Sequence, residues 1–149
     1  MGRLRTGPEK DLIDDYLVRF DRTGRALGLG PARVVEVEDK KNGGMGAEAV
    51  LLRRAVPEGS LLCVLDERGR VETSPDFANR LGGWRDQGRS DLAFIIGGAE
   101  GIEPALRKQA DHALSFGKMV WPHMLVRVML TEQLYRAASI LAGGPYHRE

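Results

Sequence analysis

A glycine-rich loop in the second half of the chain is the stretch whose residue types and spacing could bind a ligand. "FIIGGAEG", from Phe94 to Gly101, is an apolar run that leads into paired glycines, and "IEPALRKQAD" after it favours a helix. Many proteins bind nucleotide phosphates with a strand, a glycine loop and a helix in this order. A nucleotide phosphate is therefore the first ligand to consider.

The details of the loop argue against a phosphate. Neither G-x-G-x-x-G nor G-x-x-x-x-G-K-[ST] is present, and only the last third of the chain follows, where a dinucleotide-binding fold needs several more strands. Glu100 places a carboxylate inside the loop, and the nearest cations in sequence are Arg107 and Lys108. A ligand that carries positive charge fits the loop better. The alternative is that the glycines only let a strand turn tightly into a helix.

The composition limits the classes of function. A length of 149 residues favours one domain, residues 1–149, and a net charge of +1 argues against a broadly cationic nucleic-acid-binding surface, although a local basic patch stays open. The single Cys63 excludes an intrachain disulfide, and one Cys with three scattered His gives no metal-ligand spacing. Neither a membrane-spanning run nor a signal peptide is visible. We expect a cytoplasmic protein without a metal.

The elements that would position the loop alternate between helices and strands. The pattern predicts an α/β domain with a mostly parallel sheet. Predicted helices are one that opens at Pro8 with Leu12, Ile13, Tyr16, Leu17 and Phe20 on one face, one at Ala47–Val56, one with Ser74 as its cap, one over residues 104–113 and a long one at Pro122–Gly143. Predicted strands are Arg33–Glu38, Ser60–Asp66, residues 91–96 and a short one over residues 117–121.

Four stretches taken together resemble one family. They are "FIIGGAEG", "LSFGKMVWPH", "LVRVMLTEQLYRAASI" and the terminal "PYHRE". In this order and spacing they are similar to RlmH, the family of pseudouridine methyltransferases of the large ribosomal subunit within the SPOUT class. The similarity runs from about Gly2 to Glu149 and is densest from Leu92 onward.

The resemblance implies a SPOUT α/β knot. In that fold the C-terminal segment threads through a loop to make a trefoil knot, a feature nearly absent from other proteins. Family members carry a short apolar strand before "GRLRTGPE", so the sheet is expected to lack its first strand. Our hypothesis is a start codon placed too late, and an in-frame stop codon directly before Met1 would refute it.

The resemblance also implies a cofactor, S-adenosyl-L-methionine, bound against backbone from three loops. Mapped by motif, the loops begin at Leu65, at Gly98 and at Gly117. The sulfonium and amino groups of this ligand are cationic, so Glu100 carries no penalty. The residues assigned to the third loop are Gly117, Lys118, Met119, Val120, Trp121 and Pro122.

The walls of that cofactor site would be apolar. Met119, Val120 and Trp121 would supply them, and the alternative for these side chains is ordinary core. Two departures from the family stand nearby: Ala99 replaces a proline, and "LSFGKMV" replaces a Ser-Leu-Ser-x-Leu-Thr stretch, which removes hydroxyls that could bind the cofactor.

The implied reaction is methylation of N3 of pseudouridine 1915 in 23S rRNA on the assembled ribosome. Candidate catalytic residues lie near the C-terminus. Arg136 could stabilise the imide anion, Tyr146 could stack on the base, and His147 is a candidate general base because histidine titrates near neutral pH. Glu132 completes the set. The alternative for Glu132 and Arg136 is a surface ion pair.

The family acts as homodimers, and the long helix supports this because it is apolar around much of its girth. A monomer with a thicker core is the alternative. The expected partners are therefore a second copy and 23S rRNA within the ribosome, with no membrane and no metal. Two other functions stay open: a ribosome-binding SPOUT-fold factor without catalysis, and a SPOUT methyltransferase that acts on tRNA.

Overall fold

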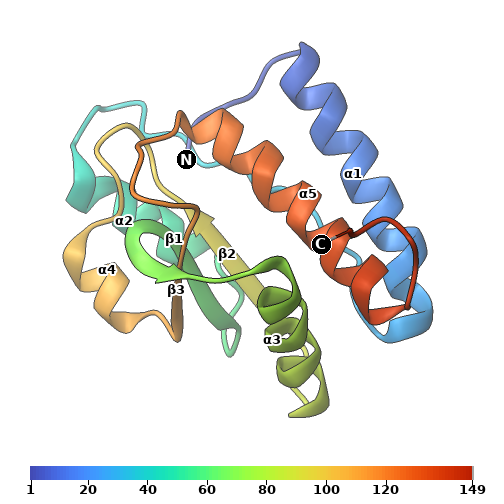
Figure 1. The fold of residues 1–149 in the computed structure, drawn as a ribbon. Coiled ribbons are helices and arrows are strands. Elements are labelled where there is room, and N and C mark those ends of the chain that lie inside the picture. Colours follow the sequence, from blue (N-terminus) through green and yellow to red (C-terminus); the bar gives the residue numbers. More distant parts are fainter. Residues whose placement is uncertain (149) are drawn as a thin grey trace. The chain divides into compact units, whose positions relative to one another are not determined.

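A computed structural model describes residues 1–148 (Figure 1). Helices and strands alternate along much of the chain, which confirms the predicted α/β class. The elements are α1 (Pro8–Gly24), the 3-10 turn η1 (Arg25–Leu27), α2 (Met45–Ala55), β1 (Leu61–Val71), α3 (Ser74–Asp86), β2 (Leu92–Ile96), α4 (Pro104–Gln109), β3 (His112–Ser115) and α5 (His123–Leu141).

The chain divides into two compact units. The sheet unit comprises Met1–Leu4, Val35–Val71 and Arg89–His123, and it contains the three strands with α2 and α4. The helical unit comprises Arg5–Val34, Glu72–Gly88 and the chain from Met124 onward, so it contains α1, α3 and nearly all of α5. The expectation of one domain over residues 1–149 stays a prediction.

The sheet is parallel throughout residues 1–148, with the order β2-β1-β3. The central strand β1 begins with the apolar run "LLCVL", whose Cys63 and Val64 are fully buried, as expected for a strand covered on both faces. Leu65 of β1 pairs with Ile96 of β2 on one side and with Leu114 of β3 on the other. The loops that follow β2 and β3 therefore leave the sheet close to the level of Leu65.

The core of the sheet unit is formed by side chains from helices and strands together. α2 contributes Ala49 and Leu52, the strands contribute Val64 and Ile95, and the segment after β2 contributes Ile102 and Leu106, with Met1 packed among them. The ammonium of Met1 donates to the carbonyl oxygen of Ile96 (2.8 Å), and the N–H of Gly2 donates to the carbonyl oxygen of Val37 (2.7 Å). The N-terminal segment is thus bound to the end of β2.

The helical unit buries one face of each of its helices. α1 opens at Pro8 as predicted, and α1 and α5 run alongside each other, with the Tyr16 and Tyr135 rings stacked 6.4 Å apart (Figure 1). Its buried apolar side chains are Ile13 and Phe20 of α1, Phe77, Ala78 and Leu81 of α3, and Leu130, Leu134, Ala137 and Ala138 of α5.

Three of the predicted strands differ from the structure: one is absent, one is longer and one lies at other residues. Residues 33–38 form no strand, because they have no ladder partner and Val34 and Val35 are exposed. The strand predicted to end at Asp66 is β1, which continues to Val71, and a register shift lets both Leu65 and Arg70 pair with Leu114. The last strand is His112–Ser115 instead of residues 117–121, where Gly117 has a φ of 114°.

The predicted helices differ from the structure in smaller ways. The helix expected over residues 104–113 is α4, and it ends at Gln109. Two hydrogen bonds between Asp111 and Leu62 of β1 follow the end of this helix. The N–H of Asp111 donates to the carbonyl oxygen of Leu62, and the N–H of Leu62 donates to the carboxylate of Asp111 (2.8 Å each), so the chain turns into β3. The N-cap of α3 is Thr73, whose hydroxyl accepts from the N–H of Asp76 (3.1 Å), and not Ser74.

Candidate cofactor loops and a candidate catalytic network

The strand register brings the three predicted cofactor loops to one edge of the sheet. Leu65 lies at the point where β2 ends on one side and β3 ends two residues before Gly117 on the other. Open parallel sheets bind ligands outside the carboxyl ends of their strands, where the strand order reverses. Here the order reverses at β1, so Leu65, Gly98 and Gly117 belong to the edge at which a ligand is expected.

The glycine loop after β2 folds back on itself. Gly98 and Gly101 form an antiparallel bridge, and the N–H of Gly101 donates to the carbonyl oxygen of Gly98 (3.0 Å). A Cβ at Gly97 would lie 2.7 Å from the carbonyl oxygen of Gly101, closer than real Cβ contacts, and Gly101 itself has a φ of 85°. The turn therefore needs glycine at both ends.

A carboxylate that the sequence prediction missed faces this loop. Glu48, in the first turns of α2, has its two oxygens 3.0 and 3.1 Å from the position of a Cβ at Gly98. Burial, followed by repulsion from Glu100, raises the pKa of the Glu48 carboxyl above its usual value, while the nearby Met1 ammonium and a hydrogen bond from the Gly98 backbone lower it. The glycine loop thus lies in a negative electrostatic environment.

The third loop is held at its start and exposed beyond it. The Ser115 hydroxyl accepts from the N–H of Gly117 (3.0 Å) and lies 3.1 Å from the carbonyl oxygen of Glu67. The side chains of Met119 and Val120 are 73% and 80% exposed, so the alternative that they are ordinary core is wrong. Lys118, Trp121 and Pro122 are exposed as well.

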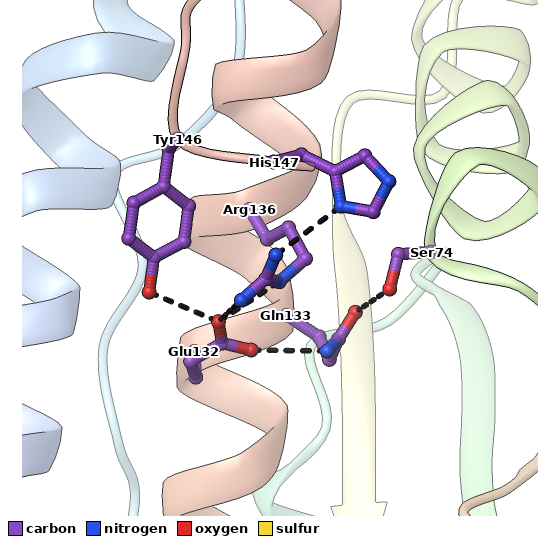
Figure 2. Close-up of polar contacts among 6 residues, drawn as sticks. All are labelled: Ser74, Glu132, Gln133, Arg136, Tyr146 and His147. Atoms are coloured by element: carbon purple, nitrogen blue, oxygen red, sulfur yellow. Dashed lines mark hydrogen bonds and ion pairs between the residues drawn. The ribbon is translucent and has the colours of Figure 1, made fainter. Parts of the chain in front are cut away.

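The four predicted catalytic side chains form one polar network in the helical unit (Figure 2). Glu132 and Arg136 lie one turn apart on α5, and the guanidinium donates twice to Oε1 of Glu132, from Nε at 2.9 Å and from Nη2 at 2.6 Å. The Tyr146 hydroxyl donates to the same oxygen (3.0 Å). Nη1 of Arg136 is 3.2 Å from Nδ1 of His147. The C-terminal tail is therefore docked on α5.

Burial and hydrogen bonding keep Tyr146 and Arg136 protonated at neutral pH. Burial, together with the hydrogen bond to Glu132, raises the pKa of Tyr146 to about 12, so its phenol keeps its proton at neutral pH. The hydrogen bond to Glu132 also raises the pKa of Arg136. The guanidinium lies 4.7 Å from the centre of the Tyr146 ring. The predicted ion pair exists, and it is part of a larger cluster and not an isolated surface pair.

The network determines the tautomer of His147. A guanidinium has no acceptor, so Nδ1 of His147 must accept from Arg136, and the ring proton of the neutral imidazole lies on Nε2. Nε2 is buried and has no hydrogen-bond partner among residues 1–148. The Nε2–H of His147 is therefore a donor that has no acceptor within the described chain.

Two further residues extend the network and were not among the predicted catalytic residues. Gln133 donates to Oε2 of Glu132 (3.0 Å), and its carbonyl oxygen accepts from the Ser74 hydroxyl (2.8 Å), which belongs to α3 (Figure 2). Both oxygens of Glu132 are thereby engaged. The sequence signals for these two were weak: Gln133 is a polar residue next to Glu132, and Ser74 was predicted only as a helix cap.

Neither a metal site nor a membrane-spanning helix is found within the described residues. Residues 1–148 contain no group of three or more His, Cys, Asp or Glu side chains with the geometry to hold a metal ion. In the same residues, no helix is both long and apolar enough to cross a membrane.

Comparisons with known proteins agree with the motifs. The family model described as "Predicted SPOUT methyltransferase" matches residues 1–147. "Ribosomal RNA large subunit methyltransferase H" of Roseobacter denitrificans is 81% identical over 148 residues, which cover 99% of this chain and 95% of the relative. Proteins of the same name from Ruegeria pomeroyi and Paracoccus denitrificans are 77% and 66% identical, over 95% and 96% of their lengths. The chain therefore belongs to the SPOUT methyltransferase family and, within it, to RlmH.

Proposed function

We propose that this enzyme transfers a methyl group from S-adenosyl-L-methionine to N3 of pseudouridine 1915 in 23S rRNA, on the assembled ribosome. The names of the relatives support rRNA of the large subunit as the substrate. The observation that carries the proposal is the docked tail, because it gathers Glu132, Arg136, Tyr146 and His147 into one network with a free donor.

The residues of the sheet edge fit this cofactor. When bound, S-adenosylmethionine supplies a methyl group on a positively charged sulfur. The glycine loop offers close backbone at Gly97 and Gly98 and carries the carboxylates of Glu48 and Glu100 on or beside it. Backbone groups suit an adenosine, and carboxylates suit a cation. We assign cofactor binding to Leu65, Gly98 and the segment Gly117–Pro122.

The helical network suits a reaction that creates an anion. N3 of the base must lose its proton before or during attack, and the imide then carries negative charge until the new N–C bond is complete. We assign Arg136 and the Nε2–H of His147 to stabilise that charge. Because Nδ1 of His147 already accepts from Arg136, and because both oxygens of Glu132 are engaged, the geometry favours donor roles over a general base. The N3 proton then leaves to water.

Tyr146 holds the network together. Its phenol stays protonated and donates to Glu132, which keeps the carboxylate aligned with Arg136. Its ring packs on Tyr135, with ring centres 4.6 Å apart. The stacking of Tyr146 on the target base, expected from the sequence, stays a prediction.

The modest charge of the chain bears on its partners. With a net charge of +1, one subunit cannot hold RNA by charge alone, so we infer recognition of the shaped ribosome by a homodimer. The exposed Met119 and Val120 are apolar surface of the kind that a second copy covers. Light scattering should give twice the mass of the chain, and a monomer at micromolar concentration would contradict the dimer.

The deciding experiment is mass spectrometry of 23S rRNA fragments from a strain that lacks this gene. We expect the methyl group to disappear from pseudouridine 1915 and to return with the wild-type gene but not with an Arg136→Ala variant. An unchanged methylpseudouridine means that the enzyme reading is wrong. In vitro, intact ribosomes should be methylated and the isolated hairpin or tRNA should not. Calorimetry that shows no S-adenosylmethionine binding at millimolar concentration would favour the non-catalytic ribosome-binding factor.

A further inference from the structure

Glu48 is an acidic side chain of α2 that contacts the glycine loop at Gly98. It lies in the first turns of α2, and its two carboxylate oxygens lie on the Gly98 main chain, at 3.0 and 3.1 Å from where a Cβ would be. No side chain larger than hydrogen at Gly98 leaves the carboxylate where it is. The loop and the carboxylate are therefore shaped to each other.

One oxygen of this carboxylate is left without a donor. Oε2 of Glu48 is buried and has no hydrogen-bond partner among residues 1–148. A buried acceptor that lacks a donor costs free energy, and a charged one costs more. Burial is the largest cause of the raised pKa of this carboxyl. Repulsion from the carboxylates of Glu100 and Asp39 raises that pKa further. The α-ammonium of Met1 and the Gly98 backbone act in the opposite direction.

Such an arrangement is unfavourable for the protein alone and favourable for a cationic ligand. Unsatisfied or strained groups of this kind persist where function uses them. Glu48 belongs to the sheet unit, and the Gly98 loop that it touches stands at the edge where the strand register places the ligand.

We propose that Glu48 is a cofactor-positioning residue, which holds the Gly98 loop and supplies the negative charge that selects a positively charged sulfur over a neutral one. This inference rests on the proposed function, because it assumes that S-adenosylmethionine binds at the glycine loop. It assigns to the chain a means to release its product: S-adenosylhomocysteine has lost the sulfonium charge and no longer gains from the carboxylate.

The test is calorimetry of full-length Glu48→Gln with both ligands. Glutamine keeps the shape and removes the charge. We expect S-adenosylmethionine to bind about tenfold more weakly, as for loss of a charge-assisted contact, while S-adenosylhomocysteine changes by less than about threefold. Glu100→Gln is the matched control: it lies on the same loop but is exposed, and its effect should be smaller for both ligands. Equal weakening of both ligands by Glu48→Gln, or no weakening, overturns the proposal.

Thermal unfolding provides a second readout that a merely structural residue would not give. The folded-state pKa of Glu48 is raised, so its contribution to stability is present below the ordinary carboxyl value and lost as pH rises through the raised value. At pH 8 the ligand-free Glu48→Gln protein should therefore melt at the same temperature as wild type or higher. A lower melting temperature together with unselective loss of binding would make Glu48 a structural residue and refute the proposal.

The pH dependence of binding separates this inference from the proposed function. Wild type should lose S-adenosylmethionine affinity as pH falls toward the raised pKa of Glu48, and Glu48→Gln should lack that dependence. Glu48→Asp, which keeps the charge, should restore part of the preference for the cationic ligand. Wild type that binds neither ligand contradicts the proposed cofactor, whereas wild type that binds both, with no selective effect of Glu48→Gln, contradicts only the role of Glu48.

Discussion

The sheet unit and the helical unit carry their candidate sites in opposite ways. At the sheet edge the main chain forms the site: a Cβ at Gly97 would clash with the backbone of Gly101, Gly101 has a positive φ, and the neighbouring Met119 and Val120 are exposed. On α5 the side chains form the site, with Glu132 and Arg136 at its centre. The backbone site therefore depends on glycine at positions where a Cβ would clash or strain the main chain, and the side-chain site depends on the charge and hydrogen bonds of particular side chains. Variants of each kind therefore test the comparison.

The largest effect is expected from Gly97→Ala. The new Cβ would lie 2.7 Å from the carbonyl oxygen of Gly101, a backbone atom that cannot move alone. We expect a stability loss of about 1–3 kcal/mol and loss of measurable S-adenosylmethionine binding. Chemical denaturation and calorimetry measure these two quantities.

Gly83→Ala is the control for that variant. Gly83 lies inside α3, and nothing lies within 4 Å of an added Cβ. Alanine should stabilise the helix by about 0.5–1 kcal/mol and leave binding unchanged. If both glycine variants behave alike, the backbone of the loop has no special role.

The next effect belongs to Arg136→Ala. Its removal leaves Glu132 and His147 without their common partner and removes a positive charge that would stabilise the transition state. We therefore expect kcat to fall by about 100-fold to 1,000-fold. Affinity for S-adenosylmethionine should stay within about twofold of wild type by calorimetry, because the loops that we assign to the cofactor belong to the other unit. A parallel loss of cofactor affinity would break the division of tasks between the two units.

Tyr146→Phe should have a smaller effect. It removes the hydrogen bond to Glu132 and keeps the ring contact with Tyr135, so we expect a loss of about 1 kcal/mol in stability and about tenfold in kcat. The pKa of Tyr146 is raised to about 12 in the folded protein. Its contribution is therefore complete below about pH 10 and lost as pH rises toward 12. Denaturation from pH 8 to 11 should show this decline in wild type and not in Tyr146→Phe.

The smallest effect is expected from Ser74→Ala. This change removes the donor to Gln133 and so loosens the support of Glu132, which should lower kcat by only a few-fold and stability by about 0.5–1 kcal/mol. Thr73→Ala is the neighbouring control, because it removes the N-cap hydrogen bond of α3 to the N–H of Asp76 and leaves the Ser74 hydroxyl in place. It should lower stability by about 1 kcal/mol and leave kcat unchanged. Equal kcat values for the two variants would show that the hydrogen bond from Ser74 to Gln133 does not contribute to catalysis.

The sequence predicted those elements whose boundaries depend on neighbouring residues. It missed those whose boundaries depend on hydrogen bonds to distant parts of the chain. Pro8 starts α1 and "LLCVL" forms the buried part of β1 because these signals act within a few residues. Residues 33–38 alternate like a strand yet have no neighbour to pair with, and Asp111 ends α4 through contacts with Leu62, which lies 49 positions away. Such contacts leave no local pattern.

The same distinction holds for the sites. The glycine loop and the residues of the C-terminal tail could be identified from motifs, and the structure joins the four tail and α5 residues as one network. Glu48 and Ser74 could not, since each meets its site from a helix distant in sequence, and nothing in "GAEAVLL" or "TSPDF" signals a ligand. Whether the named residues bind the cofactor and the base stays a prediction for the variants above.

The parallel sheet has a consequence for how this chain folds. Every ladder pair joins distant residues: Leu61 with Leu92, 31 positions apart, and Cys63 with His112, 49 positions apart. Loop-closure entropy must be overcome before either ladder stabilises the chain, so a sheet of this kind forms slowly compared with helices. We expect helical signal to appear early in refolding and the edge that holds the glycine loop to form last. Competence to bind a ligand there should therefore be the final event of folding.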